Sequence, residues 1–203
     1  MIAILEYGTG NVSSIKNMLK KIGVESIITN DLDTVHKATK FILPGVGHFD
    51  YCMSQLRKAP FFSLVEQRVK EEKVPVLGVC AGSQMLMEKS EEGTAAGLGW
   101  IKGKVIKFKQ DQLPQGYKIP HMGWTDIKPL NNNFLYEGID EPRFYFTHSY
   151  HIVPEDKTHV TALAEYGYDI TASVQSGNIM GVQFHPEKSH QFGMKLYENF
   201  AKY

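Results

Sequence analysis

The stretch Val74-Pro75-Val76-Leu77-Gly78-Val79-Cys80-Ala81-Gly82-Ser83-Gln84-Met85-Leu86 lies near the middle of the chain. It begins as an apolar run after the charged residues Lys70–Lys73, as a buried parallel strand does. Gly78 and Gly82 then flank Cys80 before a second apolar segment, which predicts a helix. A Gly-x-Cys-x-Gly pattern between a strand and a helix is typical of a nucleophile elbow, in which a sharp turn holds a reactive side chain above the sheet.

Cys80 has two interpretations from this stretch alone. At an elbow, the N–H groups and the dipole of the following helix favour the thiolate, so Cys80 would be a nucleophile. The alternative is that Cys80 is a small buried core residue, the commonest fate of a free cysteine. The choice depends on what the rest of the chain supplies.

The composition of the chain limits the number of domains, the kinds of partner and the compartment that we expect. The 203 residues predict one domain spanning 1–203, with a substantial core. Because Lys plus Arg equals Asp plus Glu, we expect neither nucleic acid nor a membrane surface as partner. Two cysteines make no disulfide framework, and the start lacks a signal-peptide pattern, so we expect a cytoplasmic protein.

The first 90 residues alternate strands with helices. The expected strands are Ile2–Tyr7, Glu25–Ile28, Lys40–Leu43 and the run before Cys80, and the expected helices are one carrying Val12, Ile15, Leu19 and Ile22, then Phe49–Arg57 and Phe61–Glu72. This alternation predicts a parallel, doubly wound sheet. In such sheets the functional site lies beyond the carboxyl ends of the strands.

After Gly97 the pattern changes to short strands between turn signals. They are expected at Lys104–Phe108, Thr125–Ile127, Phe144–Thr147, His151–Val153, Val160–Glu165, Ile170–Val174 and Asn178–Phe184, followed by a helix that carries Phe192, Leu196 and Phe200. The predicted fold class is therefore α/β: a three-layer, mostly parallel central sheet with flanking helices and an antiparallel extension. Residues 109–117 are the expected mobile loop.

A cysteine nucleophile needs a base, and His185 is the best placed of the eight histidines. It follows an apolar strand and is itself followed by Pro186-Glu187. Residues i and i+2 of an extended segment point to the same side, so Glu187 would orient the His185 ring in a Cys–His–acid triad. The alternative is a solvated turn at the end of a strand.

An acyl-transfer site also needs donors for the developing oxyanion. The N–H of Ala81, next to the nucleophile, is one natural donor. Gly45-Val46-Gly47 is a candidate for the second, because its glycines let the backbone approach a substrate. A plain strand-to-helix turn also uses glycine, and that alternative remains open.

Other sites have weaker support. Gly8-x-Gly10 lacks the third glycine of a dinucleotide fingerprint. His148 and His151 have no third metal ligand at a suitable spacing, so we expect no metal. His121 and His148 are interface or core histidines in this interpretation, and the nearby aromatic residues favour packing over recognition.

These features together resemble a class I glutamine amidotransferase. Gly-Val-Cys-Ala-Gly-Ser-Gln (78–84) and Gly-Val-Gln-Phe-His-Pro-Glu-Lys-Ser (181–189) are similar to the two signatures of that class, and the likeness spans nearly the whole chain. Leu-Pro-Gly-Val-Gly (43–47), Pro-His-Met-Gly-Trp (120–124) and Thr-His-Ser-Tyr (147–150) resemble the branch that supplies ammonia to a (β/α)-barrel cyclase in histidine biosynthesis. Thr9 and Thr125 stand where Met and Asn are frequent.

The resemblance implies roles for individual residues. Cys80, His185 and Glu187 would form the triad, and Val46 or Gly47 together with Ala81 would bind the oxyanion. L-glutamine would be held by Gln84, Glu92, Ser149 and Tyr150, with no cofactor. The interface with the cyclase in a heterodimer would include Pro120, Met122, Trp124, Tyr145 and Lys188.

Three alternatives remain at this stage. A paralogous glutaminase could supply ammonia to a nucleotide-sugar amidotransferase in surface-polysaccharide synthesis. A cysteine hydrolase of another amide, such as a peptidase, could use the same triad. A catalytically silent regulatory subunit is the third, and the complete triad argues against it.

Overall fold

The computed structural model describes all residues, 1–203. Its helices are α1 (Val12–Lys21), α2 (Leu32–Lys37), α3 (Phe49–Lys58), α4 (Phe62–Lys70), α5 (Ala81–Gln84) and α6 (His190–Lys202). Its strands are β1 (Ile2–Leu5), β2 (Ser26–Thr29), β3 (Lys40–Gly45), β4 (Val76–Cys80), β5 (Lys89–Ser90), β6 (Gly103–Lys107), β7 (His121–Pro129), β8 (Arg143–His148), β9 (Tyr150–Pro154), β10 (Val160–Glu165), β11 (Asp169–Ser176) and β12 (Ile179–Val182). Short 3₁₀ turns are η1 (Gln110–Gln112), η2 (Phe134–Tyr136), η3 (Lys157–His159) and η4 (Pro186–Lys188).

The sheet has a parallel half and an antiparallel half. Strands β2, β1, β3, β4 and β12 are neighbours in that order and run parallel. Beyond β12 the sheet continues through β11, β10, β7 and β8, each antiparallel to the one before. The mixed sheet with an antiparallel extension confirms the predicted fold class.

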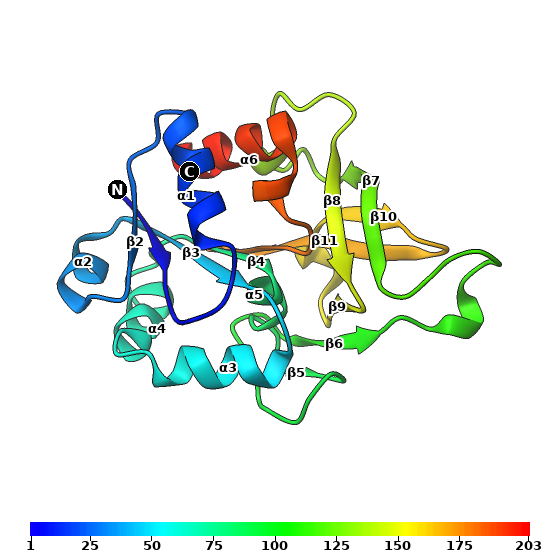
Figure 1. Ribbon diagram of the computed structural model, residues 1–203, viewed down its shortest axis with the longest axis horizontal. Helices are drawn as coiled ribbons and strands as arrows, with labels where there is room; N and C mark the ends of the chain where they lie inside the picture. The colour runs from blue at the N-terminus through cyan, green and yellow to red at the C-terminus, as the bar shows by residue number, and fades with distance from the viewer.

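Helices cover both faces of the parallel half, with α1 and α6 on one side and α3 and α4 on the other (Figure 1). The alternation of side chains along a strand explains this arrangement. In β1, Ile2 and Ile4 join the apolar cluster that includes α1 and α6. Ala3 and Leu5 join the cluster that includes α3 and α4. A strand buried on both faces is therefore apolar throughout.

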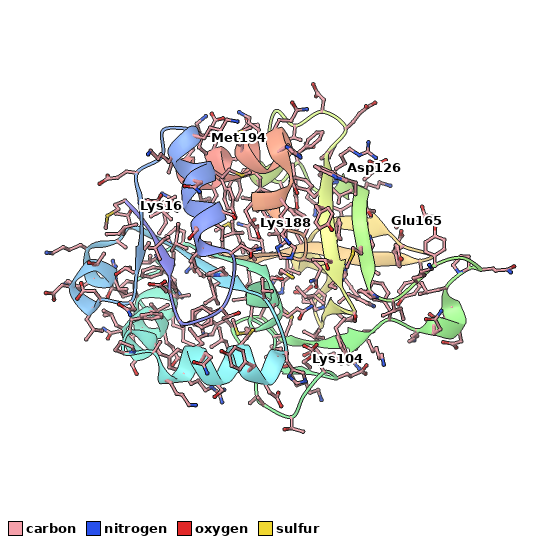
Figure 2. All side chains as sticks on the ribbon, viewed as in Figure 1. Lys16, Lys104, Asp126, Glu165, Lys188 and Met194 are labelled. Carbon is pink, nitrogen blue, oxygen red and sulfur yellow. The ribbon has the colours of Figure 1, made fainter.

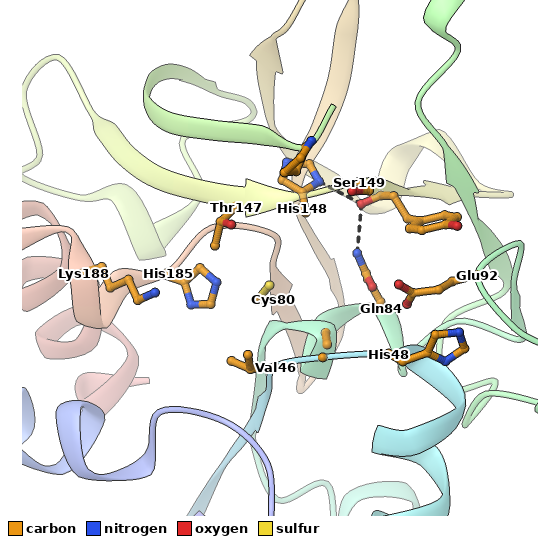
Figure 3. A pocket seen from close by; sticks show the side chains of 14 residues that line it. Val46, His48, Cys80, Gln84, Glu92, Thr147, His148, Ser149, His185 and Lys188 are labelled. Atoms are coloured by element: carbon orange, nitrogen blue, oxygen red, sulfur yellow. Dashed lines mark hydrogen bonds between the residues drawn. The ribbon is translucent and has the colours of Figure 1, made fainter. Parts of the chain in front are cut away.

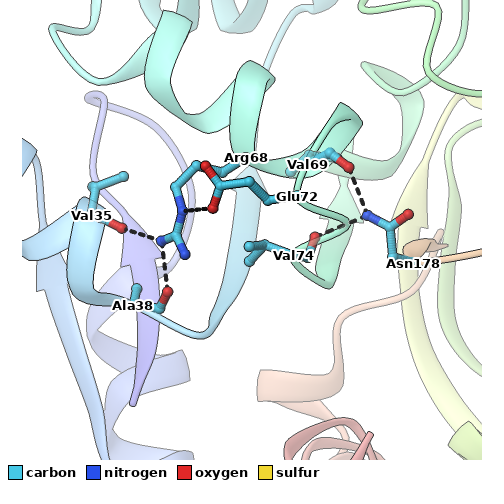
Figure 4. A network of polar contacts seen from close by, with 7 residues as sticks. All are labelled: Val35, Ala38, Arg68, Val69, Glu72, Val74 and Asn178. Atoms are coloured by element: carbon cyan, nitrogen blue, oxygen red, sulfur yellow. Dashed lines mark hydrogen bonds and ion pairs between the residues drawn. The ribbon is translucent and has the colours of Figure 1, made fainter.

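The end of the sheet away from the site is fixed by two polar side chains (Figure 4). The Arg68 guanidinium of α4 donates to the carbonyls of Val35 and Ala38, at 2.8 and 2.7 Å, and satisfies the last carbonyls of α2. Asn178 donates to the carbonyls of Val69 and Val74, at 2.9 and 3.0 Å. These bonds fix α2, α4 and the start of β4 relative to one another.

Helix α2 was not predicted from the sequence. The feature that could have indicated it is the capping residue Asp31, whose carboxylate accepts from the Thr34 N–H at 2.8 Å. The predicted helix after Cys80 is also largely wrong, because α5 ends at Gln84 after a single turn and Met85–Glu88 is turn and bend. The strand expected at Thr125–Ile127 is longer, since β7 runs from His121 to Pro129. Part of the loop 109–117 forms η1.

No helix is both long enough and apolar enough to cross a membrane.

Candidate active site

Three neighbouring parallel strands bring the predicted triad and oxyanion segments to one edge of the sheet. Gly45 at the end of β3 is paired with Cys80 at the end of β4. β12 lies on the other side of β4, and His185 follows its last residue, Val182, by three positions. A cleft of about 410 Å³ opens there, and Figure 3 shows Cys80 between His185 and Gln84.

Cys80 itself carries the strain of the elbow. Its backbone has φ 55° and ψ −114°, a conformation that costs a non-glycine residue about 1–3 kcal/mol. The flanking glycines allow close packing rather than an unusual φ. A Cβ at Gly82 would lie 1.9 Å from the Leu43 carbonyl oxygen, and one at Gly78 would lie 2.7 Å from the Gly82 carbonyl oxygen. α5 therefore packs directly on the backbone of β3 and β4.

Behind Cys80 lies a hydrogen-bonded pair. The His185 Nδ1–H donates to Glu187 Oε1 at 2.8 Å, and both side chains are almost fully buried. The predicted extended backbone is wrong here, because Pro186–Lys188 forms the 3₁₀ turn η4, with Pro186 at a position that suits proline. The turn still brings residues two apart together. Since Nδ1 faces the carboxylate, Nε2 is the nitrogen left for Cys80.

The electrostatics of His185 favour its protonated form. Burial alone lowers the pKa of His185, but the charge of the Cys80 thiolate, its hydrogen bond and the Glu187 carboxylate together raise it to about 10. For Glu187, burial raises the pKa, and the hydrogen bond and charge of His185 outweigh it and lower the pKa. His185 is therefore an imidazolium and Glu187 a carboxylate at neutral pH.

Two residues of the site were not predicted. The side chain of Asn11 donates to Glu187 Oε1 at 2.8 Å, so this carboxylate oxygen accepts from both His185 and Asn11. Asn11 occupies the N-cap position of α1 but makes no side-chain cap bond. A cap residue that does not cap its helix is a sign of another role. The position of Asn11 after β1, at the same edge of the sheet as Cys80, could have indicated that it belongs to the site.

The second unpredicted residue is Thr9, which holds the Gly45-Val46-Gly47 turn. The Val46 N–H, an expected oxyanion donor, donates to Thr9 Oγ1 at 3.0 Å, and the Thr9 hydroxyl donates to the Val46 carbonyl at 2.6 Å. Gly47 lines the cleft with φ 107°. Ala81 also lines it, and as the first residue of α5 its N–H has no acceptor within the helix.

The four residues expected to hold the substrate all line the cleft: Gln84, Glu92, Ser149 and Tyr150. Gln84 Nε2 donates to the Tyr150 carbonyl at 2.9 Å. Glu92 Oε2 accepts from the Phe49 N–H at 2.8 Å, at the N-terminus of α3. The cleft therefore offers a carboxylate and an amide opposite the thiol.

The expected interface residues lie beside the cleft. Pro120 and Lys188 line it. Met122 and Trp124 are large exposed apolar side chains on one face of β7. The Lys188 ammonium lies 5.7 Å from the centre of the Tyr145 ring, and Figure 2 places Lys188 between α6 and β8. We call the surface of Met122, Trp124, Tyr145 and Lys188 the docking face.

Metal chemistry has no obvious site. Nowhere do three His, Cys, Asp or Glu side chains form a group with the geometry to hold a metal ion. His121, His148 and His151 do gather around Phe108, and His148 also lines the cleft.

Comparisons with known proteins identify the family of the chain. The family described as "Glutamine amidotransferase class-I" matches residues 3–202. Imidazole glycerol phosphate synthase subunit HisH 2 of Methanococcus maripaludis is 51% identical over 100% of this chain and 99% of its own length. The subunit HisH 2 of Pseudomonas aeruginosa is 43% identical with the same coverage. A crystal structure of a glutamine amidotransferase has the same fold, with a TM-score of 0.75 at 20% identity over 99% of this chain and 97% of that one. The chain belongs to the class I glutamine amidotransferase family.

Proposed function

We propose that the protein is a glutaminase that hydrolyses L-glutamine to glutamate and ammonia. The observation that carries the proposal is Cys80 on its strained elbow, with the buried His185–Glu187 pair behind it. Membership of the family supports the same reaction. The full-length match to family members argues against the peptidase alternative.

In the first half-reaction the Cys80 thiolate attacks the side-chain amide carbon of glutamine. The carbonyl electron pair moves onto oxygen, where the Ala81 N–H and one N–H of the 45–47 turn stabilise it. The protonated Nε2 of His185 gives its proton to the amide nitrogen, which leaves as ammonia. A glutamyl thioester on Cys80 remains.

In the second half-reaction water attacks the thioester. His185, now neutral, takes a proton from the water, the new tetrahedral intermediate collapses, and the Cys80 thiolate leaves. Glutamate is released and His185 is again protonated. Glu187 keeps the ring in one orientation throughout, because its Oε1 accepts from the His185 Nδ1–H and is itself held by the side-chain N–H of Asn11.

The end of the cleft opposite Cys80 is also suited to glutamine. We assign Glu92 to the α-ammonium group, because it is the carboxylate that lines the cleft opposite Cys80. Gln84, Ser149 and Tyr150 would hold the rest of the substrate. Glutamine would displace water from a largely preformed pocket.

We further propose that the ammonia goes to a synthase partner. The relatives named above are subunits of imidazole glycerol phosphate synthase, so the partner we propose is a (β/α)-barrel cyclase of histidine biosynthesis that binds the docking face. The paralogue that feeds a nucleotide-sugar amidotransferase is a second candidate. The observation that favours it is the number 2 in the names of both relatives, which marks each as one of a numbered set.

Two smaller proposals follow from the same observations. Residues 1–203 form one domain, because α1 and α6, at opposite ends of the chain, contact each other on one face of the sheet. The compartment is the cytoplasm, because both cysteines are free and a nucleophilic thiol has to stay reduced.

The test of the glutaminase is ammonia release by the purified chain with its partner. Cys80→Ala should abolish glutamine hydrolysis, while synthesis by the partner from added ammonia should continue. Hydrolysis by the Cys80→Ala protein would refute the proposal. Co-purification separates the two acceptors: a barrel cyclase alone supports the synthase, and an added sugar amidotransferase supports the paralogue.

A further inference from the structure

Two buried histidines beside the cleft, one of which lines it, take no part in the proposed reaction. His121 on β7 and His148 on β8 are paired residues of the antiparallel ladder, with 1% and 6% of their surface exposed. Their rings are 5.0 Å apart between centres. The His121 ring is stacked between Tyr166, at 3.9 Å, and Phe146, at 4.7 Å. Burying two polar rings side by side is unfavourable unless each nitrogen has a partner.

Three of the four ring nitrogens form a chain with the Thr125 hydroxyl at one end. Thr125 Oγ1 lies 2.7 Å from His121 Nε2, and His121 Nδ1 lies 3.0 Å from His148 Nε2. The remaining nitrogen, His148 Nδ1, lies 2.8 Å from the carbonyl oxygen of Tyr150. Every nitrogen of the pair is therefore engaged.

The chemistry of the groups fixes the direction of this chain. A carbonyl oxygen only accepts, so His148 Nδ1 carries a proton. Burial lowers the pKa of His121 to about 4 and the pKa of His148 well below its usual value, so both rings are neutral. His148 Nε2 must then accept from the His121 Nδ1–H, and His121 Nε2 must accept from the Thr125 hydroxyl.

The chain ends on a carbonyl that also orients Gln84. The Tyr150 oxygen accepts both the His148 Nδ1–H and one N–H of Gln84, at 2.9 Å, and Figure 3 shows both bonds. The other N–H of Gln84 donates to Gln183 Oε1 at 3.2 Å. Both amide protons of Gln84 are used, so its Oε1 is the atom left to accept from a ligand in the cleft.

We propose that the His121–His148 pair is a positioning device for the substrate pocket, which fixes the Tyr150 carbonyl and thereby presents Gln84 Oε1 as an acceptor for an N–H group of the substrate. This inference rests on the proposed glutaminase function for the identity of the substrate. His121 and His148 act through Tyr150 and Gln84, so they are positioning residues and take no part in the chemistry. The Tyr150 carbonyl at one end of the chain fixes both tautomers, and the Thr125 hydroxyl at the other end satisfies His121 Nε2, which would otherwise be a buried acceptor without a donor.

Two matched pairs of variants test the proposal. His121→Phe keeps an aromatic ring between Tyr166 and Phe146 but removes both nitrogens, whereas His121→Asn places an amide N–H close to the position of Nδ1. Thr125→Val removes the hydroxyl with almost no change of shape, and Thr125→Ser keeps it. The measurement is kcat and KM for glutamine, with active sites counted by titration with a glutamine-directed alkylating agent.

We expect His121→Phe and Thr125→Val to raise KM roughly tenfold, the size of one lost buried hydrogen bond, with kcat per titrated site within about threefold of the wild-type value. His121→Asn and Thr125→Ser should stay within about threefold in KM. An unchanged KM in both His121→Phe and Thr125→Val would overturn the proposal. So would a loss confined to the number of titratable sites, which is what a purely structural role predicts.

A spectroscopic measurement separates this inference from the proposed function. In the wild-type protein labelled with ¹⁵N-histidine, NMR should show both rings neutral and protonated on Nδ1, and Thr125→Val should keep these tautomers while changing the ¹⁵N shift of His121 Nε2, which loses its donor. A His148 ring protonated on Nε2 would overturn the inference. The NMR result does not depend on turnover. A wild-type chain that hydrolyses no glutamine would refute the proposed glutaminase function. The tautomers of His121 and His148 would still decide the role of the histidine pair.

Discussion

At the scale of single residues, the conformation of Cys80 and the hydrogen bond of Val46 have opposite effects on catalysis. Cys80 holds a strained backbone and is a buried residue that lines the cleft. The Val46 N–H, in contrast, donates to Thr9 and points to that hydroxyl rather than to a substrate. For the proposed mechanism, Cys80 already lines the cleft, whereas one of the two expected oxyanion donors is not directed at a substrate.

Thr9 should therefore restrain the free enzyme. Thr9→Val removes two hydrogen bonds to the Val46 peptide, each contributing a net free energy of about 1 kcal/mol. We expect the rate of glutamine hydrolysis without a partner to rise roughly tenfold. Thr9→Ser, which retains the hydroxyl, should behave as the wild-type protein. A Thr9→Val protein that folds normally and is no faster would show that this hydrogen bond does not limit the rate.

Burial lowers the pKa of His185, and interaction with Cys80 is the largest of the causes that raise it to about 10, so Cys80→Ala should lower that pKa in an NMR titration. The effect on stability follows from the sign of the shift. A raised pKa stabilises the fold fully below about 6.5, the usual value for histidine, and this stabilisation is lost as the pH rises through about 10. The wild-type protein should therefore lose stability relative to Cys80→Ala as the pH approaches 10, measured by urea unfolding. Parallel curves for the two proteins would show that Cys80 does not raise the pKa of His185.

At the scale of elements, the site depends on how closely α5 packs on β3. A Cβ added at Gly45 would lie 2.3 Å from the Gly82 nitrogen, and one at Gly82 would lie 1.9 Å from the Leu43 carbonyl oxygen. Backbone meets backbone at this contact, so neither partner can move aside as a side chain could. The contact fixes the height of Cys80 above the sheet.

Gly82→Ala should therefore destabilise the protein by more than about 3 kcal/mol, beyond the usual range for overpacking. Gly23→Ala is the control, because a Cβ there meets nothing within 4 Å and only its φ of 73° is unfavourable for alanine. We expect that control to lose about 1 kcal/mol. Both values come from chemical denaturation, and equal losses in the two variants would contradict the packing argument.

The sequence predicted most elements because their signals are local. Alternating apolar strands and helices predicted the parallel half, and β10 was predicted at its observed bounds. The one-turn length of α5 was not predictable, because Met85 and Leu86 are apolar in either a helix or a turn and only the fold decides. For the same reason Asn11 and Thr9 were missed: each acts on a residue far away in the chain, Glu187 or Val46.

At the scale of the whole molecule, the cleft and the docking face open on the same side. The docking face joins three separate segments, β7, β8 and η4, and Trp124 is also stacked on His190 at the start of α6. Trp124 is 41% exposed and Met122 61% exposed, which is unusual for large apolar side chains set close together. A partner bound there would cover the cleft and take up ammonia as it leaves.

Trp124→Ala should weaken binding of the partner about tenfold or more, as loss of an aromatic residue at the centre of an interface commonly does. Hydrolysis of glutamine by the isolated chain should change less than about twofold, because Trp124 does not line the cleft. Leu32→Ala is a control on the far edge of the sheet, where Leu32 is 46% exposed on α2 (Figure 1). Titration calorimetry with the purified cyclase gives both affinities, and equal effects of the two substitutions would show that the partner binds elsewhere.

The most direct test of the central claim, that Cys80 is the nucleophile for glutamine, uses the only other cysteine as an internal control. The protein is treated with a glutamine-directed alkylating agent, with and without excess glutamine, and both cysteine peptides are analysed by mass spectrometry. The structure predicts one label on Cys80, blocked by glutamine, and none on Cys52, which lies fully buried on the inner face of α3 with burial raising its pKa. Labelling of Cys52, or labelling of Cys80 that glutamine does not prevent, would contradict it.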